Sequence, residues 1–150
     1  MIDRFDEILN ELGNIYSVTL HPDKVGACKI QFPEQFAIQL ECDPHLENLL
    51  VATYICEIPP GKFRENIFKD ALKANHPFAQ NGALAYSEKN NQLVLFSYLR
   101  LASLNGRKLS EFIQAFIEKA SGWRTGVETG QTSQLVSQSS KSSGTIFDVK

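Results

Sequence analysis

The side chains best suited to nucleophilic or metal chemistry in this chain are three cysteines and three histidines. They are Cys28, Cys42 and Cys56, and His21, His45 and His76. The histidines form neither an H-x-x-x-H nor an H-E-x-x-H pair, so a zinc site lacks its usual spacing. Each cysteine lies in an apolar, strand-like segment, where a free cysteine usually acts as a small hydrophobic residue. A thiol enzyme that pairs Cys42 or Cys56 with His45 stays open as an alternative.

Other catalytic motifs are also missing from the sequence. There is no glycine-rich phosphate-binding motif, and the carboxylates near the predicted strand ends, Glu41, Asp43 and Glu57, are not paired for acid–base chemistry. The formal net charge is -2, and the polar strand positions, such as Lys29, Gln31, Gln39 and Glu41, lack the exposed aromatic residues interleaved with Lys and Arg that an RNA-binding sheet has. We therefore predict a binding protein without enzymatic activity, metal, cofactor or nucleic-acid partner.

Length and composition predict one small folded domain. The chain has 150 residues, of which 43% are hydrophobic, including ten Phe, and 21% are charged. Asp3, Asp6 and Glu7 break any signal-peptide pattern at the amino terminus. The longest apolar run, 49–56, is too short to cross a bilayer. We expect a cytoplasmic protein that does not insert into membranes.

Hydrophobic periodicity predicts an α+β fold in the order α-β-β-β-β-α-β-β-α, with three helices and an antiparallel twisted sheet of five to six strands. Helical spacing marks residues 2–12, 62–75 and 107–121, with Gly13 and Gly122 as the expected stops of the first and last helix. Period-two alternation marks residues 16–20, 28–32, 36–42, 49–58, 84–87 and 93–99.

Two predicted strands, 49–58 and 93–99, are apolar on both faces. Three helices offer little to cover a second sheet face, so this surplus apolar surface indicates contact with other chains.

The composition changes near residue 125. Fifteen of the 25 residues from 126 to 150 are Ser, Gly, Thr or Gln. Such a segment buries too little apolar surface to offset its ordering entropy. The predicted organisation is thus a folded domain at 1–125 and a disordered tail at 126–150.

The stretch from Leu72 to Trp123 carries a family resemblance. Its features are Leu72, Ala74 and Asn75 at a helix end, then Phe78, Gly82, Tyr86, Leu93, Leu95 and Leu99, followed by an apolar-striped final helix. With the opening from Phe5 to Gly13 and the order of elements, the chain resembles the class I type III secretion chaperones, the Tir-chaperone type (CesT/SycE-like), over residues 2–124.

The resemblance implies a function. Such chaperones are cytoplasmic bacterial homodimers that bind the N-terminal chaperone-binding region of one or more secreted effectors. They keep this region extended and secretion-competent and deliver it to the secretion apparatus without ATP hydrolysis. Contact with the ATPase or sorting components of that apparatus is left open. A small thiol-dependent hydrolase and a non-catalytic dimeric adaptor, whose tail binds a partner, are the alternatives.

The resemblance and the apolar phase of each element together give candidate contact residues. The effector-binding candidates, from the first helix and the meander, are Phe5, Leu9, Leu12, Val18, Leu20, Ile30, Phe32, Phe36, Ile38 and Leu40. The dimer-interface candidates, from the second helix and the last strand, are Phe68, Ala71, Leu72, Leu93, Leu95 and Phe96. An effector segment is expected to add a strand to the meander edge and place side chains in neighbouring pockets.

Overall fold

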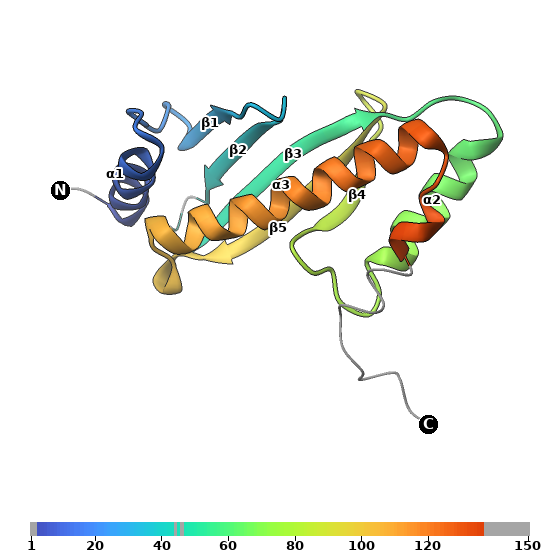
Figure 1. The fold of residues 1–150 in the computed structure, drawn as a ribbon. Coiled ribbons are helices and arrows are strands. Elements are labelled where there is room, and N and C mark those ends of the chain that lie inside the picture. Colours follow the sequence, from blue (N-terminus) through green and yellow to red (C-terminus); the bar gives the residue numbers. More distant parts are fainter. Residues whose placement is uncertain (1–2, 44, 46, 137–150) are drawn as a thin grey trace. The chain divides into compact units, whose positions relative to one another are not determined.

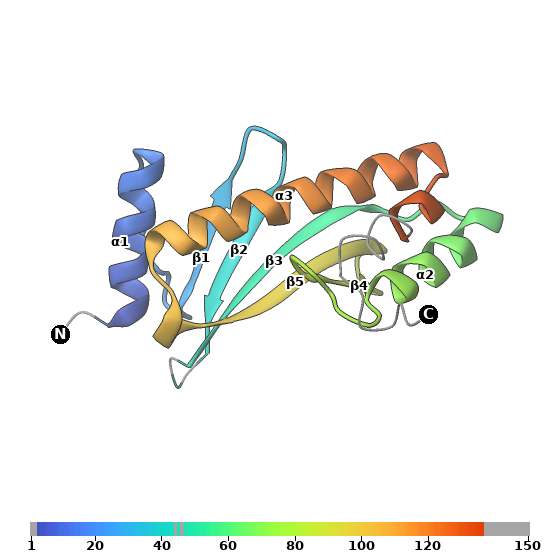
Figure 2. The ribbon, with the colours of Figure 1, turned by 60° about the horizontal axis from the view of Figure 1, so that its bottom comes forward.

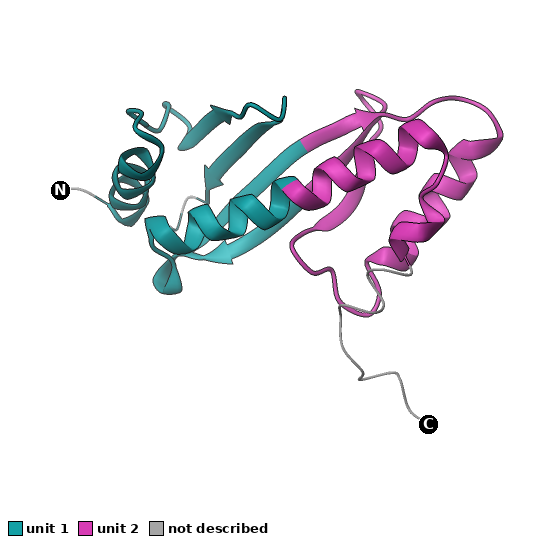
Figure 3. Ribbon diagram, in the orientation of Figure 1, with its two compact units in different colours: residues 1–53, 96–117 teal, residues 54–95, 118–150 magenta. Residues whose placement is uncertain are grey.

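A computed structural model describes residues 3–43, 45 and 47–136 of the chain. These residues fall into two compact units (Figure 3). Unit 1 contains residues 1–53 and 96–117, and unit 2 contains residues 54–95 and 118–150.

The predicted α+β class is confirmed (Figure 1). Its elements are α1 (Arg4–Tyr16), β1 (Ala27–Gln31), β2 (Ala37–Cys42), β3 (Asn48–Glu57), α2 (Lys62–Ala74), β4 (Ala83–Ser87), β5 (Gln92–Arg100), a 3₁₀ turn (Leu101–Ser103) and α3 (Gly106–Thr129). The five strands have the order β1-β2-β3-β5-β4, and β2 pairs antiparallel with both β1 and β3. The strand predicted at 16–20 is wrong.

The first helix runs further than its sequence pattern predicted. Asp3 caps its start by accepting the Asp6 N–H at 2.8 Å. The helix passes through Gly13 and ends at Tyr16, and Ser17 takes the left-handed conformation instead (φ 58°). A Cβ on Gly13 would lie 2.5 Å from the Val18 carbonyl oxygen. Gly13 therefore allows the returning chain to approach the helix closely, and it is not the stop residue.

The last helix also continues past its predicted stop. Asn105 caps it as predicted, by accepting the Lys108 N–H at 2.8 Å. Gly122 lies inside the helix, which ends at Thr129, just before Gly130 with its φ of +71°. The tail predicted to begin at 126 therefore starts within α3, and the expected disorder is wrong for residues 126–136. Residues 137–150 lie outside the described part of the chain.

Each unit has its own buried apolar residues. In unit 1, α1 buries Phe5, Ile8, Leu9 and Leu12, while the meander buries Ile30, Ile38 and Leu40, and α3 buries Leu109, Ile113 and Phe116. In unit 2 the buried residues include Ile55, Ile67, Leu84, Leu93, Leu95 and Trp123. Among the described residues, no helix is both long enough and apolar enough to span a bilayer.

The strand β3, which is apolar on both faces in sequence, has one face buried and the other half-buried or exposed. In unit 1, Leu49, Val51 and Thr53 of β3 are buried, whereas Leu50 and Ala52 between them are half-buried. In unit 2, Ile55 is buried and Tyr54 is exposed. Each unit thus keeps apolar strand surface that its own described residues only partly cover.

Candidate functional site

The free edge of β1 is the first candidate binding surface (Figure 2). Hydrogen bonds to β2 and the turn before it flank this strand at both ends. The Cys42 N–H donates to the Gly26 oxygen at 3.1 Å, and the Phe32 N–H donates to the Phe36 oxygen at 2.9 Å. Hydrogen-bonded pairs alternate along an antiparallel ladder. The backbone groups of Lys29 therefore point away from β2, as do those of Gln31, at the edge where another strand could pair.

One end of this edge is already occupied by the chain itself. The turn before β1 folds back so that the Asp23 N–H donates to the Ala27 oxygen at 2.7 Å. The Asp23 carboxylate accepts the N–H groups of Val25 and Ala27, both at 2.9 Å. These bonds limit the open part of the edge to Lys29 and Gln31, so an added strand has a defined starting register.

Exposed and half-buried apolar side chains lie in the segments that precede and follow β1 in unit 1. The rings of Tyr16 and Phe32 meet edge-to-face with centroids 5.5 Å apart, and burial raises the pKa of the Tyr16 hydroxyl. Val18 is 50% exposed and Val25 is 73% exposed, while Leu20 is half-buried. We call Tyr16, Val18, Leu20, Val25, Phe32 and the outward backbone of Lys29 and Gln31 the β1-edge surface.

The structure divides the predicted effector-binding residues into two groups. Val18, Leu20 and Phe32 lie on the β1-edge surface. The other seven, Phe5, Leu9, Leu12, Ile30, Phe36, Ile38 and Leu40, are buried in the core. These seven side chains pack inside the domain, and their predicted contact with an effector stays a prediction. The alternation of apolar residues in the sequence therefore does not distinguish core residues from residues of a binding surface.

Sequence reasoning missed Tyr16 and Val25 as members of this surface. Tyr16 was placed on a strand, because the helix was expected to stop at Gly13. Val25 is a single apolar residue within a predicted turn, and an isolated Val in a turn is a weak sequence signal of exposed apolar surface.

The predicted dimer residues are divided in the same way. Ala71, Leu93 and Leu95 are buried within unit 2, and their predicted contact with a second copy stays a prediction. Phe68 is half-buried against Tyr86, with ring centroids 4.9 Å apart, and Phe96 is half-buried in unit 1. Leu72 is 70% exposed on α2. A leucine this exposed on a helix is the member of the set best placed to contact another chain.

A polar network beside Phe68 fixes the start of α2 in unit 2. The Arg64 guanidinium donates to the Asn91 side-chain oxygen at 2.8 Å, to the Ile58 oxygen at 3.3 Å and to the Tyr86 hydroxyl. It also stacks over the rings of Phe68 and Tyr86, at 5.2 and 5.1 Å from their centroids. These contacts connect the start of α2 to the Phe68 and Tyr86 rings and to Asn91.

The thiols are poorly suited to nucleophilic chemistry. Burial raises the pKa of Cys42 to about 11, with further contributions from the charges of Asp43 and Asp3. Burial also raises the pKa of Cys28 and of Cys56. A reactive thiol needs the opposite shift, toward the thiolate at neutral pH. Within the described residues, no group of three His, Cys, Asp or Glu side chains could hold a metal ion.

The sequence of this chain matches a known protein family. The family model of the Tir chaperone protein (CesT) family matches residues 7–124. The chain belongs to this family. The sequence resemblance to secretion chaperones is thereby confirmed, and the matched residues end within α3. No curated protein matches the chain in sequence.

Solved structures share the fold of this Tir chaperone family member. The HopA1-SchA chaperone-effector complex contains a chain that is 21% identical, with a TM-score of 0.68, and the match covers 83% of this chain and 99% of that one. A chain of the ExsC-ExsE complex is 19% identical, with a TM-score of 0.71, and the match covers 80% of this chain and 90% of that one. A chain of the heterodimeric ExoU-SpcU complex from the type III secretion system of Pseudomonas aeruginosa is 18% identical, with a TM-score of 0.65. This match covers 81% of this chain and 98% of that one.

Proposed function

We propose that this chain is a cytoplasmic type III secretion chaperone that binds the N-terminal segment of a secreted effector and keeps it extended. The observation that carries the proposal is the family match over residues 7–124. The chaperone-effector and heterodimeric complexes among the structures of the same fold support it. Burial raises the pKa of the Cys42 thiol to about 11 and also raises the pKa of Cys56, which argues against the thiol-hydrolase alternative.

The β1-edge surface is the proposed place where the effector segment binds. An extended segment would pair its backbone with the outward groups of Lys29 and Gln31, which gives affinity for any sequence. Its alternate side chains would contact the apolar residues Val18, Leu20 and Phe32, which gives selectivity. Ordering an extended chain costs free energy, so a large surface is needed, and a dimer would offer two such edges.

We further propose that the dimer forms through α2 in unit 2. Leu72 is the most exposed apolar residue of this helix, and Arg64 at the start of the helix donates to the side chain of Asn91. A two-fold contact requires one self-complementary patch, and a preformed apolar helix face provides one.

The test of effector binding uses the full chain and a synthetic peptide library covering the first hundred or so residues of secreted proteins encoded with it. We expect micromolar or tighter binding of at least one extended apolar segment without added ATP. Lys29→Pro removes an outward N–H, and we expect about tenfold or more loss of affinity, since one backbone hydrogen bond and the strand register are lost.

Two controls make this test specific. Val18→Glu should weaken binding, whereas Gln114→Glu, which adds the same charge on an exposed position of α3, should not. Unchanged affinity for both Lys29→Pro and Val18→Glu would exclude the β1 edge. If no segment binds the wild-type chain, the chaperone function itself is rejected.

A non-catalytic adaptor that binds its partner through the tail is the remaining alternative. Deleting residues 137–150 leaves every described element in place. The proposed chaperone keeps its effector affinity after this deletion, whereas an adaptor that binds through residues 137–150 of the tail loses its partner.

A further inference from the structure

Lys29 places a single positive charge on the open edge of β1. It is the only charged residue of this strand, and its side chain is exposed. None of the ion pairs among the described residues involves Lys29. Its ammonium group therefore lies beside the open edge without a carboxylate of the described chain as its partner.

The side chain of Lys29 lies on the polar face of the unit 1 sheet. Lys29 stands opposite Gln39 of β2, whereas the next pair, Ile30 and Ile38, is buried on the other face. Residues that stand opposite each other in an antiparallel pair share a face, and successive residues of one strand alternate between faces. A strand added at β1 would thus place one side chain next to Lys29 and the two flanking side chains on the apolar face.

The turn before β1 determines where an added strand can begin. Asp23 already takes the place opposite Ala27, because its N–H donates to the Ala27 oxygen at 2.7 Å and its carboxylate accepts the Ala27 N–H at 2.9 Å. Lys29 is the next residue whose backbone points outward, so the end residue of the added strand would bond to it. The Cα atoms of such a bonded pair lie about 5.5 Å apart, which brings the two side chains into contact.

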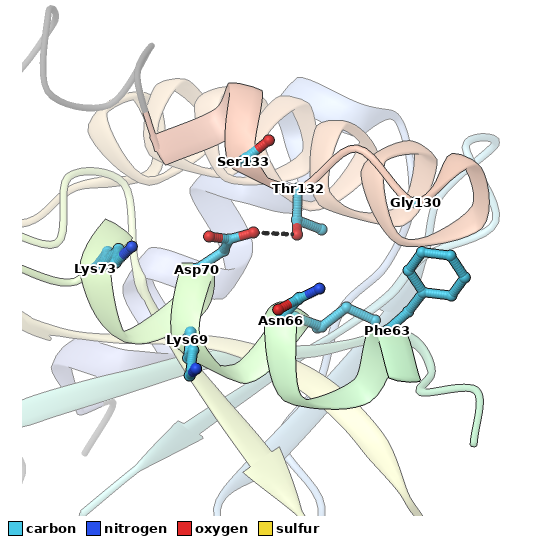
Figure 4. A pocket seen from close by; sticks show the side chains of 9 residues that line it. Phe63, Asn66, Lys69, Asp70, Lys73, Gly130, Thr132 and Ser133 are labelled. Atoms are coloured by element: carbon cyan, nitrogen blue, oxygen red, sulfur yellow. Dashed lines mark hydrogen bonds between the residues drawn. The ribbon is translucent and has the colours of Figure 1, made fainter. Parts of the chain in front are cut away.

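The cavity of unit 2 shows no comparable preference for one charge (Figure 4). It has a volume of about 250 Å³ and is lined by residues of α2 and of the segment that follows α3. Its charged residues are of both signs, and two of them are already paired. Asp70 accepts the Thr132 hydroxyl at 2.6 Å, and the Lys69 ammonium lies 3.2 Å from the Glu65 carboxylate. The β1 edge is therefore the better place to look for selection by charge.

We propose that Lys29 selects effector segments in which an acidic residue, flanked by apolar residues, stands opposite it in the added strand. This inference rests on the proposed chaperone function and adds the chemistry of the partner segment. Opposite charges that face each other across a strand pair are favourable, and like charges are unfavourable. The apolar neighbours of the acidic residue point to the face of the sheet that carries Ile30.

The experiment measures the affinity of the full chain for variants of one peptide. The probe is the library segment that the wild-type chain binds most tightly, synthesised with Glu, Gln or Lys at each position in turn. With wild type we expect one position at which the Glu peptide binds about fivefold or more tightly than the Lys peptide, with Gln between them. In Lys29→Glu the order of the three peptides at this position should reverse.

Lys89→Glu is the matched control, because it makes the same change of charge at an exposed position of the turn between β4 and β5. It should leave the order of the three peptides unchanged. Three results would each overturn the selection by Lys29 and leave the chaperone function intact: no charge preference in wild type, an unchanged preference in Lys29→Glu, or the same reversal in Lys89→Glu. If no library segment binds wild type, the chaperone function is rejected, and this inference is rejected with it.

Discussion

The side chain of Asn75 pairs with the backbone of Leu84 through both of its polar atoms. Its amide nitrogen donates to the Leu84 oxygen at 2.9 Å, and its oxygen accepts the Leu84 N–H at 2.9 Å. Leu84 lies on β4, the last strand in the sheet order. Asn75 thus substitutes for a neighbouring strand at one residue of this edge and connects the end of α2 to it.

Replacing Asn75 should therefore destabilise unit 2. We expect Asn75→Ala to lower the free energy of unfolding by about 1–3 kcal/mol, because Leu84 loses two partners. Asn75→Asp should cost more, since a carboxylate would face the Leu84 carbonyl oxygen. Urea denaturation measures the change. Asn66→Ala, at an exposed position of the same helix, is the control and should stay within about 0.5 kcal/mol of wild type.

Two glycines in helices should respond oppositely to alanine. At Gly13 the new Cβ would lie 2.5 Å from the Val18 oxygen, so Gly13→Ala must displace backbone, and we expect a loss of about 1–3 kcal/mol. At Gly122 the nearest atom is Leu135 Cδ2 at 3.8 Å. Gly122→Ala should gain about 0.5–1 kcal/mol from helix propensity. Thermal unfolding followed by circular dichroism compares the two, and stabilisation by Gly13→Ala would contradict the close approach.

Lys119 should make stability depend on alkaline pH. Its ammonium donates to the oxygens of Gln80 and Gly82, at 2.6 and 2.7 Å, and burial lowers its pKa from 10.5 to about 8. Between these values the unfolded chain binds the proton more tightly than the folded chain. The free energy of unfolding should therefore rise from pH 8 toward pH 10.5 through this group.

Lys119→Met removes this contribution. The difference in unfolding free energy between wild type and variant, measured in urea at pH 7.5, 9 and 10, should grow with pH in favour of wild type. Other titrating groups cancel in the difference. A difference that is constant across this range would show that the two carbonyl oxygens compensate for the burial of the charge.

The spacing of hydrophobic residues identified most helices and strands, because the hydrogen bonding within these elements sets which residues share a face. The α2 prediction of 62–75 lies within one residue of Lys62–Ala74, and Asn105 caps α3 as expected. The errors occur at glycines. Gly13 and Gly122 were interpreted as stops, yet both lie inside helices. Sequence alone does not distinguish a glycine that ends a helix from one that lets another segment pack closely on the helix. The packing segment is distant in the chain or has no regular secondary structure, so no local pattern marks it.

The candidate site was less predictable than the fold. Ile38 and Val18 are both β-branched apolar residues in segments predicted to be strands, but Ile38 is buried and Val18 is exposed. The distinction depends on which neighbours cover each position, and that is a property of the packed domain. The half-open strand faces, in contrast, agree with the surplus apolar surface expected from the composition.

The sequence by itself determined the α+β class, the resemblance to secretion chaperones and the lack of a recognisable catalytic motif, because these depend on residue types and short-range spacing. The tertiary structure alone decided which apolar residues remain at the surface, which edge of β1 is open, and that Thr132 meets Asp70 across 62 positions of chain. Such contacts are set by the packing of distant segments, and no local pattern encodes them.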